Sequence, residues 1–241
     1  MVKILNSLAR QVVPLNARFR IRTSKAVVLP LFFIELFKRK NRFLGHSKED
    51  SKLAELLDED NGTYIDIGSG RPISGSNTFY FYRKGWKGIL IDPLTTNRIL
   101  SQFLRPRDKF IQGVISENPD FEIPFWEFYP YGNSTTVQEL AEKQEKKLGF
   151  YLVRKVNIKN IPINSLASLL MENLTLLSID TEGRDFEILQ GLDFSIIKPK
   201  VICVEAWTKN EENEIAGLLF RNGYFFTGRF GNSIIFHRIK I

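Results

Sequence analysis

Acidic and small residues stand at the ends of the apolar runs of this 241-residue sequence, where they could bind a ligand and accept a proton. The runs at 64–68, 88–92, 109–115, 174–180 and 200–207 are short and apolar, which is typical of buried parallel strands. Parallel strands meet their ligands at their carboxyl ends, so we predict one acid-lined site there. The residues in or directly after these ends are Asp66, Gly68, Ser69, Gly70, Asp92, Pro93, Ser116, Glu117, Asp180, Glu182 and Glu205.

The loop after the first run reads GSGRPISG, residues 68–75, and its spacing indicates which ligand fits. A dinucleotide-binding loop places a third glycine where its helix begins, so that the helix N-terminus meets a pyrophosphate. Here that glycine is missing, Pro72 delays the helix, and the nearby carboxylates would repel a phosphate. S-adenosylmethionine (SAM) has no phosphate and carries a cationic sulfonium. We therefore predict SAM, with Asp66 near the charge and Asp92 at the ribose hydroxyls.

The same loop predicts how the helix after it begins. Ser76, Asn77 and Thr78 are good capping residues, so we expect them to start a helix over about 77–84. The candidate cofactor-binding residues are Asp66, Gly68, Ser69, Gly70, Asn77, Thr78, Asp92, Pro93, Ser116 and Glu117.

The motifs around these residues resemble the FkbM family of SAM-dependent methyltransferases. The resemblance rests on Pro72, on SNT at 76–78, on GWKG at 85–88 and on the D-x-E-G block at 180–183, and it extends over about residues 48–238. It implies a class I methyltransferase fold and O-methylation of a hydroxyl, commonly on a sugar or a polyketide-type natural product. The loop departs from the family pattern at Gly70-Arg71, so Arg71 is expected either to pair with the methionine carboxylate or to face solvent.

A sugar hydroxyl is a poor nucleophile near neutral pH, so a base must take its proton. Both histidines are poor candidates, because His46 precedes the domain and His237 lies on the last predicted strand. We predict Asp180 as the base and Glu182 as the second choice. Alternatively, Asp180, Glu182 and Glu205 hold a divalent cation that acidifies the hydroxyl.

Acceptor contacts are predicted after the third and fifth strands. The segment 125–136 is expected either to form a lid, with Asn133 and Ser134 on the acceptor, or to be an ordinary packed loop. Glu205 is expected to contact the acceptor as well. Trp207 is expected either to stack on a sugar face or to pack in the core.

The net charge of +7 is concentrated at the N-terminus. Residues 1–45 carry ten Lys or Arg and one acid, Glu35, so residues 46–241 have a net charge of −2. A nucleic-acid enzyme more often spreads its cations over a binding face, so we predict no nucleic-acid partner. The apolar run 26–37 is too short to span a bilayer. It is predicted either to pack on the body or to lie on an anionic membrane surface, and a transit peptide is a weaker alternative.

Strands and helices alternate along the chain, which predicts an α/β fold. We expect a Rossmann-like class I methyltransferase fold: a mostly parallel twisted sheet with helices on both faces, an antiparallel C-terminal hairpin and one antiparallel edge strand. Residues 1–45 would form a basic extension and 46–241 the methyltransferase domain. The one cysteine, Cys203, favours a reduced, cytoplasmic setting, in which the protein is either free or peripheral at the inner face of the membrane.

The same residues leave two other functions as alternatives. The chain could be a non-catalytic cofactor-binding subunit of a glycan-assembly complex, but the intact glycines and carboxylates argue against this. It could be a nicotinamide-dependent oxidoreductase, but the missing glycine argues against this. The sequence does not predict the identity of the small-molecule or glycan acceptor, or the oligomeric state.

Overall fold

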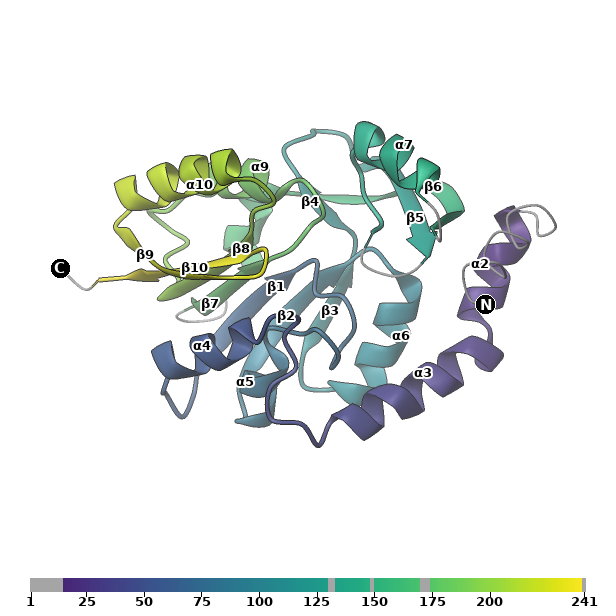
Figure 1. Ribbon diagram of the computed structural model, residues 1–241, viewed down its shortest axis with the longest axis horizontal. Helices are drawn as coiled ribbons and strands as arrows, with labels where there is room; N and C mark the ends of the chain where they lie inside the picture. The colour runs from purple at the N-terminus through teal and green to yellow at the C-terminus, as the bar shows by residue number, and fades with distance from the viewer. Residues whose placement is uncertain (1–14, 130–132, 148–149, 170–173, 240–241) are drawn as a thin grey trace.

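The computed structural model describes residues 15–129, 133–147, 150–169 and 174–239 (Figure 1). A seven-stranded sheet has the order β3-β2-β1-β7-β8-β10-β9, so its strands, counted along the chain, run 3-2-1-4-5-7-6. Strands β3, β2, β1, β7 and β8 are parallel, which confirms the predicted α/β class. The seven strands are β1 Thr63–Ile67, β2 Lys87–Asp92, β3 Lys109–Gln112, β7 Leu174–Ile179, β8 Val201–Glu205, β9 Tyr224–Phe230 and β10 Ser233–Arg238.

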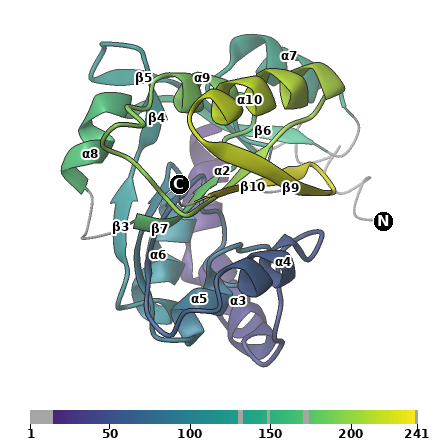
Figure 2. The same ribbon diagram turned by 90° about the vertical axis from the view of Figure 1, so that its left-hand side faces the viewer.

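Helices cover both faces of this sheet (Figure 2), because successive strand residues point to opposite sides. Ile65 and Ile67 pack into one core with the helices α8 Leu166–Leu169, α9 Asp185–Gln190 and α10 Lys209–Arg221. Tyr64, which precedes Ile65, points to the other side and packs into the second core with α4 Glu49–Leu56, α5 Phe79–Arg83 and α6 Thr95–Leu104. The apolar runs of the sequence are therefore strands buried from both sides.

The predicted strand 109–115 is two strands. Gly113 separates β3 from β4, Val114–Ser116, and a Cβ at Gly113 would lie 2.8 Å from the carbonyl oxygen of Lys159. Beyond Gly113 the chain leaves the main sheet and forms a second one, of order β4-β6-β5, with β6 Tyr151–Pro162 and β5 Glu122–Tyr129. The charged helix predicted between β5 and β6 is α7, Gln138–Lys146, and its predicted stop at Gly149 lies outside the described residues.

The predicted C-terminal hairpin is present, but the strand that runs antiparallel to β8 is not at the edge of the sheet. β10 lies between β8 and β9 and is antiparallel to both. The residues of β10 explain this order, because Ile234, Ile235 and Phe236 are buried on both faces of the sheet. β9 carries the exposed side chains Phe225 and Phe226 and takes the edge position instead.

Two helices from the basic extension pack on the body. They are α2 Leu15–Thr23 and α3 Lys25–Lys38. In α3, Val28, Leu31 and Phe32 pack against the second core. Within the described ranges, no helix has the length and apolarity that crossing a membrane requires.

Candidate functional site

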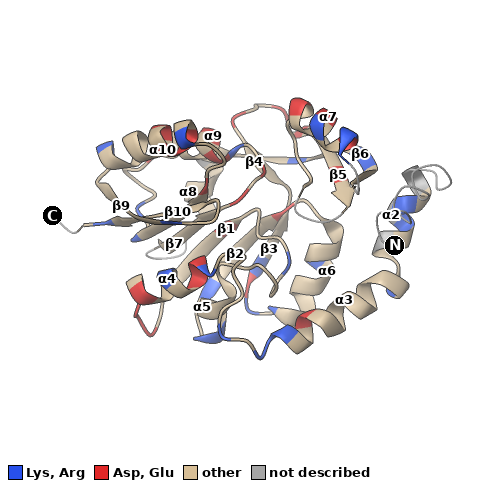
Figure 3. Ribbon diagram, in the orientation of Figure 1, with Lys and Arg blue, Asp and Glu red and all other residues tan. Residues whose placement is uncertain are grey.

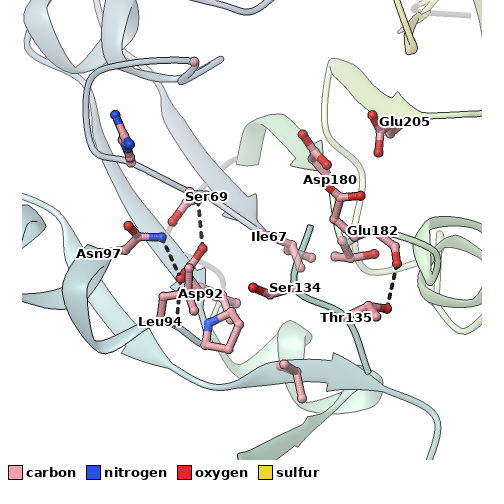
Figure 4. A pocket seen from close by; sticks show the side chains of 18 of the residues that line it. Ile67, Ser69, Asp92, Leu94, Asn97, Ser134, Thr135, Asp180, Glu182 and Glu205 are labelled. Atoms are coloured by element: carbon pink, nitrogen blue, oxygen red, sulfur yellow. Dashed lines mark hydrogen bonds between the residues drawn. The ribbon is translucent and has the colours of Figure 1, made fainter. Parts of the chain in front are cut away.

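A cavity of about 560 Å³ lies at the carboxyl ends of β1, β2, β7 and β8 (Figure 4). Its centre is the boundary between β1 and β7, where the strand order reverses, which is the expected ligand position in such a sheet. The predicted site residues that line it are Gly68, Ser69, Gly70, Asp92, Pro93, Ser134, Asp180, Glu182, Glu205 and Trp207.

The floor of the cavity is the turn after β1. The backbone N–H of Gly68 donates to Ile91 O at 2.8 Å, and φ of Gly68 is +74°. A Cβ there would lie 1.7 Å from the carbonyl oxygen of Asp180, so only glycine lets β1 and β7 approach this closely. The N–H of Gly70 donates to Asp92 Oδ2 at 2.9 Å, which holds the turn against the end of β2.

Asp92 fixes one side of the cavity. Its Oδ1 accepts from the N–H of Leu94 at 2.8 Å and from Nδ2 of Asn97 at 3.0 Å. Burial raises the pKa of Asp92 to about 7, against these hydrogen bonds, which favour the ionised form. Asn97, which the sequence analysis missed, also lines the cavity. No local motif marks it, because it is one polar residue on an amphipathic helix.

Arg105, which the sequence analysis also missed, stabilises the loop between β1 and α5 through hydrogen bonds. Its side chain is 1% exposed and donates to Ser76 Oγ at 3.1 Å, to Pro72 O at 3.3 Å and to Thr78 Oγ1 at 3.0 Å. An ion pair with Asp108 at 2.6 Å balances its charge. Buried charge is tolerated only when paired in this way. The loop is therefore pre-formed rather than left for a ligand to order.

Glu35 of α3 holds the same loop from the other side. Its side chain is completely buried, and Oε2 accepts from the N–H of Ser74 at 2.7 Å and of Ile73 at 3.2 Å. Arg71 lies 3.7 Å from Glu35 Oε1, so the structure places it beside this carboxylate and on the cavity wall. The extension thus contributes directly to the predicted cofactor loop.

Six predicted side chains do not reach the cavity wall: Asp66, Asn77, Thr78, Ser116, Glu117 and Asn133. Asp66 lies behind the wall, because it shares the sheet face of Tyr64 and accepts from Thr78 Oγ1 at 2.6 Å. Asn77 donates to Ser178 Oγ at 3.3 Å. Of the three predicted capping residues, Ser76 caps α5, since its Oγ accepts from the N–H of Phe79 at 3.1 Å.

The last three are held by the second sheet and its neighbours. Ser116 is fully buried and donates to Asn160 Oδ1 at 3.0 Å. The backbone N–H of Glu117 donates to Glu187 Oε1 at 3.0 Å. Asn133 accepts from Gln144 Nε2 at 3.3 Å. These contacts follow from the departure of the chain from the main sheet after Gly113, which the sequence pattern did not show.

Three carboxyl groups form the opposite side of the cavity from Asp92: Asp180, Glu182 and Glu205 (Figure 4). The side chains of Asp180 and Glu205 interact, and this interaction favours the protonated form of Asp180 and the ionised form of Glu205. Burial and then the charge of Glu205 raise the pKa of Asp180 well above its ordinary range. Burial and then Glu182 raise the pKa of Glu205 to about 7. Burial raises the pKa of Glu182 to about 8.

The turn after β7 keeps Glu182 in an uncommon conformation, with φ +55°. Asp185 pins this turn, because its carboxylate accepts from the N–H of Thr181 at 3.1 Å and of Gly183 at 3.3 Å. Thr135 Oγ1 donates to Glu182 O at 3.0 Å, which ties the turn to the segment after β5. A strained residue that is held from several sides is typical of a functional site.

A sequence profile of the FkbM methyltransferase domain matches residues 66–226, which is more than half of the chain. The chain belongs to the FkbM methyltransferase family. Together with the 3-2-1-4-5-7-6 strand order, this makes the sheet the class I, Rossmann-like methyltransferase fold that the sequence predicted, and the protein a SAM-dependent methyltransferase. A search of curated protein sequences returned no match.

Solved structures similar to this methyltransferase include a TehB-like SAM-dependent methyltransferase from Corynebacterium glutamicum, with 11% identity over 79% of this chain and 88% of that one, at a TM-score of 0.40. The 1,6-didemethyltoxoflavin-N1-methyltransferase of Burkholderia thailandensis, solved with S-adenosylhomocysteine, is 13% identical over 89% of each chain, at a TM-score of 0.43. An O-methyltransferase from Bacillus cereus, also solved with S-adenosylhomocysteine, is 9% identical over 100% of each chain, at 0.42.

The cavity of this FkbM-family methyltransferase contains buried polar atoms without hydrogen-bond partners, and SAM carries groups that would pair with them. Ser69 Oγ, Asn97 Oδ1 and Glu205 Oε2 are buried and have no hydrogen-bond partner among the described residues. All three residues line the cavity. Buried polar atoms are costly to leave unpaired, so partners from a ligand with several donors would satisfy them. The ammonium and the hydroxyls of SAM are such donors.

The predicted divalent cation is not supported. In the described parts of the methyltransferase, no group of three His, Cys, Asp or Glu side chains is arranged to hold a metal ion. Burial is the main cause of the raised pKa values of Asp180 and Glu205.

The cavity of the methyltransferase is also lined by three residues that sequence reasoning missed: Lys38 of the extension, and His46 and Ser47 directly after it. His46 was expected to precede the domain, which is wrong: it lies against Gly75, where an added Cβ would be 2.4 Å from Nε2. Thr136 and Arg184 line the cavity as well, and Arg184 donates to Thr136 Oγ1 at 2.5 Å. Only their proximity to predicted site residues could have indicated them.

The raised carboxyl pKa values predict that SAM binding depends on pH. Between pH 6 and 9, Glu205 and Glu182 lose their protons, and the cavity becomes more negative. SAM carries a sulfonium charge that S-adenosylhomocysteine lacks, so the affinity ratio of SAM to S-adenosylhomocysteine should rise about tenfold. One charge about 8 Å away, at an effective dielectric of about 30, contributes about 1.4 kcal/mol. Calorimetry with both ligands measures the ratio, and their shared amino group cancels.

The same groups also predict how the stability of the ligand-free protein depends on pH. Their pKa values are higher in the folded protein than in the unfolded chain, so the folded state binds more protons between about pH 4 and 8. The contribution of these groups to the stability of the ligand-free protein should therefore fall as the pH rises through this window.

For the binding experiment, a ratio of SAM to S-adenosylhomocysteine affinity that stays flat from pH 6 to 9 would contradict the placement of the sulfonium near Glu182 and Glu205.

Proposed function

We propose that this protein transfers the methyl group of SAM to a hydroxyl oxygen of a sugar, a glycan or a related natural product, with Asp180 as the general base. The observation that carries the proposal is the Asp180–Glu205 pair at the ends of β7 and β8. A base works best when its pKa lies near the working pH, and burial beside a second carboxyl group moves Asp180 in that direction.

The roles of the residues follow from their positions. SAM supplies an electrophilic methyl group on a cationic sulfur. The turn at Gly68 and Gly70, closed by Asp92, provides a rigid floor against which the donor is oriented. As the hydroxyl oxygen bonds to the methyl carbon and the carbon–sulfur bond breaks, ionised Asp180 takes the hydroxyl proton. Glu205 interacts with Asp180 and favours its protonated form. The nearby sulfonium lowers the pKa of Asp180, so the binding of the donor itself prepares the base. Alignment of the oxygen with the methyl group supplies much of the rate.

Trp207 supports a sugar or ring-shaped acceptor. It follows Glu205, lines the cavity, and is 55% exposed, so it is not the core aromatic that was the alternative. An exposed indole offers a flat apolar face beside the carboxyl pair, and sugars and polyketide rings have matching faces. Ser134, on the segment after β5, lines the cavity from the other sheet and is a candidate hydrogen-bonding partner for the acceptor.

Replacing Trp207 by alanine should raise KM for the acceptor about tenfold and leave the Kd for SAM within about twofold, because a stacked aromatic face contributes about 1 kcal/mol or more. Initial rates at varied acceptor concentration, with SAM titrated separately, measure both. Phe220→Ala is the matched control, since Phe220 is 65% exposed on α10 and does not line the cavity. Equal KM changes in both variants would remove Trp207 from the acceptor site.

The test of the function is transfer of isotope-labelled methyl from SAM to pools of glycans and ring-shaped natural products. Label that survives mild alkali but not ether cleavage identifies an O-methyl ether, whereas alkali-labile label identifies an ester and would contradict the proposal. Tight SAM binding without transfer to any acceptor would favour the non-catalytic subunit of a glycan-assembly complex. The buried, free Cys203 supports a cytoplasmic setting as part of the same proposal.

A further inference from the structure

Helix α3 has two apolar faces, and packing on the body uses only one of them. Val28, Leu31 and Phe32 face the core. The opposite side carries five large apolar side chains in contact with solvent, from 39% exposed at Leu36 to 75% at Phe37: Leu29, Phe33, Ile34, Leu36 and Phe37. Five exposed large apolar side chains on one 14-residue helix form a contiguous patch, which typically marks an interaction surface.

The patch continues onto α6. Phe103 of α6 is 71% exposed, and its ring meets Phe32 edge to face at 6.4 Å between centroids. The rings of Phe32 and Phe33 are also in edge contact, at 5.7 Å, so the exposed and packed faces of α3 are joined. The patch is therefore held on a fixed helix that the body supports.

Cations frame the patch at both ends of α3 (Figure 3). Lys25 lies at the N-terminal end, and exposed Arg39, Lys40 and Arg42 follow the C-terminal end. The one acid of residues 1–45, Glu35, is turned inward and completely buried. The outward side of α3 thus combines apolar side chains with positive charge and carries no negative charge.

We infer that α3 docks on the surface of an anionic phospholipid bilayer, with its axis along the membrane plane and Leu29, Phe33 and Phe37 among the acyl chains. A helix of 14 residues is about 21 Å long and cannot span the apolar core, but an amphipathic helix of this length can lie in the interface. The cations then meet the phosphate groups. Charge complementarity selects this occupant over a second copy of the chain, whose identical cationic patch would repel. Since Lys38 lines the cavity, docking would bring the cavity close to the headgroups.

The test is flotation of the purified full-length protein with vesicles of phosphatidylcholine alone or with 30% phosphatidylglycerol. Binding to the anionic vesicles is expected, with at least a tenfold lower partition coefficient on neutral vesicles or in 0.5 M salt. The triple variant Leu29→Ser/Phe33→Ser/Phe37→Ser and the variant Arg39→Gln/Lys40→Gln/Arg42→Gln should each lose at least tenfold. These side chains are exposed, so unchanged SAM binding and unfolding temperature serve as the check on folding.

Two control variants remove side chains of the same kinds from surfaces away from α3. Phe121→Ser/Ile196→Ser/Phe220→Ser removes three exposed apolar side chains away from α3, and Lys143→Gln/Lys146→Gln removes charge from α7. Both should bind vesicles like the unmodified protein. The inference is overturned if the unmodified protein does not float with anionic vesicles, or if both α3 variants float as well as it does. The patch would instead be assigned to self-association under two conditions: the unmodified protein does not bind vesicles, and light scattering shows that it forms a dimer that only the triple variant loses.

Discussion

Replacing Asp180 by asparagine should lower kcat for methyl transfer by a factor of about 10²–10⁴ while SAM still binds. That is the range by which a positioned general base accelerates a reaction. The fold should tolerate the change, because asparagine has the size of Asp180 without its charge, and burial already favours the uncharged form of Asp180. Single-turnover rates with labelled SAM, beside a SAM titration, measure the two effects separately.

Two further variants make this result specific. Glu182→Gln tests the second choice of base. If it abolishes transfer and Asp180→Asn does not, the base is Glu182. Asp58→Asn, at a side chain that is 94% exposed, controls for loss of a negative charge and should be neutral. Normal turnover of both Asp180→Asn and Glu182→Gln would remove carboxylate base catalysis from the proposed mechanism.

The parallel sheet and its catalytic edge were predictable because they follow from local sequence. Short apolar runs that end in Asp92, Asp180 and Glu205 form buried strands, each with a carboxylate at its C-terminal end. Parallel pairing brings these C-terminal ends together. Gly68 was predictable for the same reason, since a close approach of two backbones requires glycine.

Side-chain direction was not predictable from the same patterns. Asp66 was expected to contact the cofactor, but its side chain lies on the same face of the sheet as Tyr64. There it accepts a hydrogen bond from Thr78, which in turn accepts one from Arg105, so Asp66 does not line the cavity. Arg105 lies 39 residues further along the chain than Asp66, and no periodicity links them. The second sheet escaped prediction similarly, because one residue, Gly113, redirects an apolar run that otherwise is typical of a single strand.

Glu35→Ala is expected to have the second large effect, on the cofactor loop rather than on the chemistry. It leaves the N–H groups of Ile73 and Ser74 without their charged acceptor, inside a region where Glu35 has no exposure to water. Losing buried hydrogen bonds to a charged group costs about 3 kcal/mol. The loop should loosen, and the Kd for SAM should rise at least tenfold, because binding must then order the loop. Thermal unfolding and calorimetry with SAM measure the two losses.

Phe33→Ala, on the exposed face of the same helix, is the matched control and should change neither value, whereas Glu35→Gln retains an acceptor oxygen and should lie between. A loss of stability with an unchanged Kd for SAM in the folded protein would limit Glu35 to a structural role. The expected result would instead make α3 part of the donor site, although it lies outside the region that matches the family, residues 66–226. The helix would then have two roles: its inner face, through Glu35, shapes the predicted cofactor loop, and its outer face carries the exposed side chains that we propose bind a membrane surface.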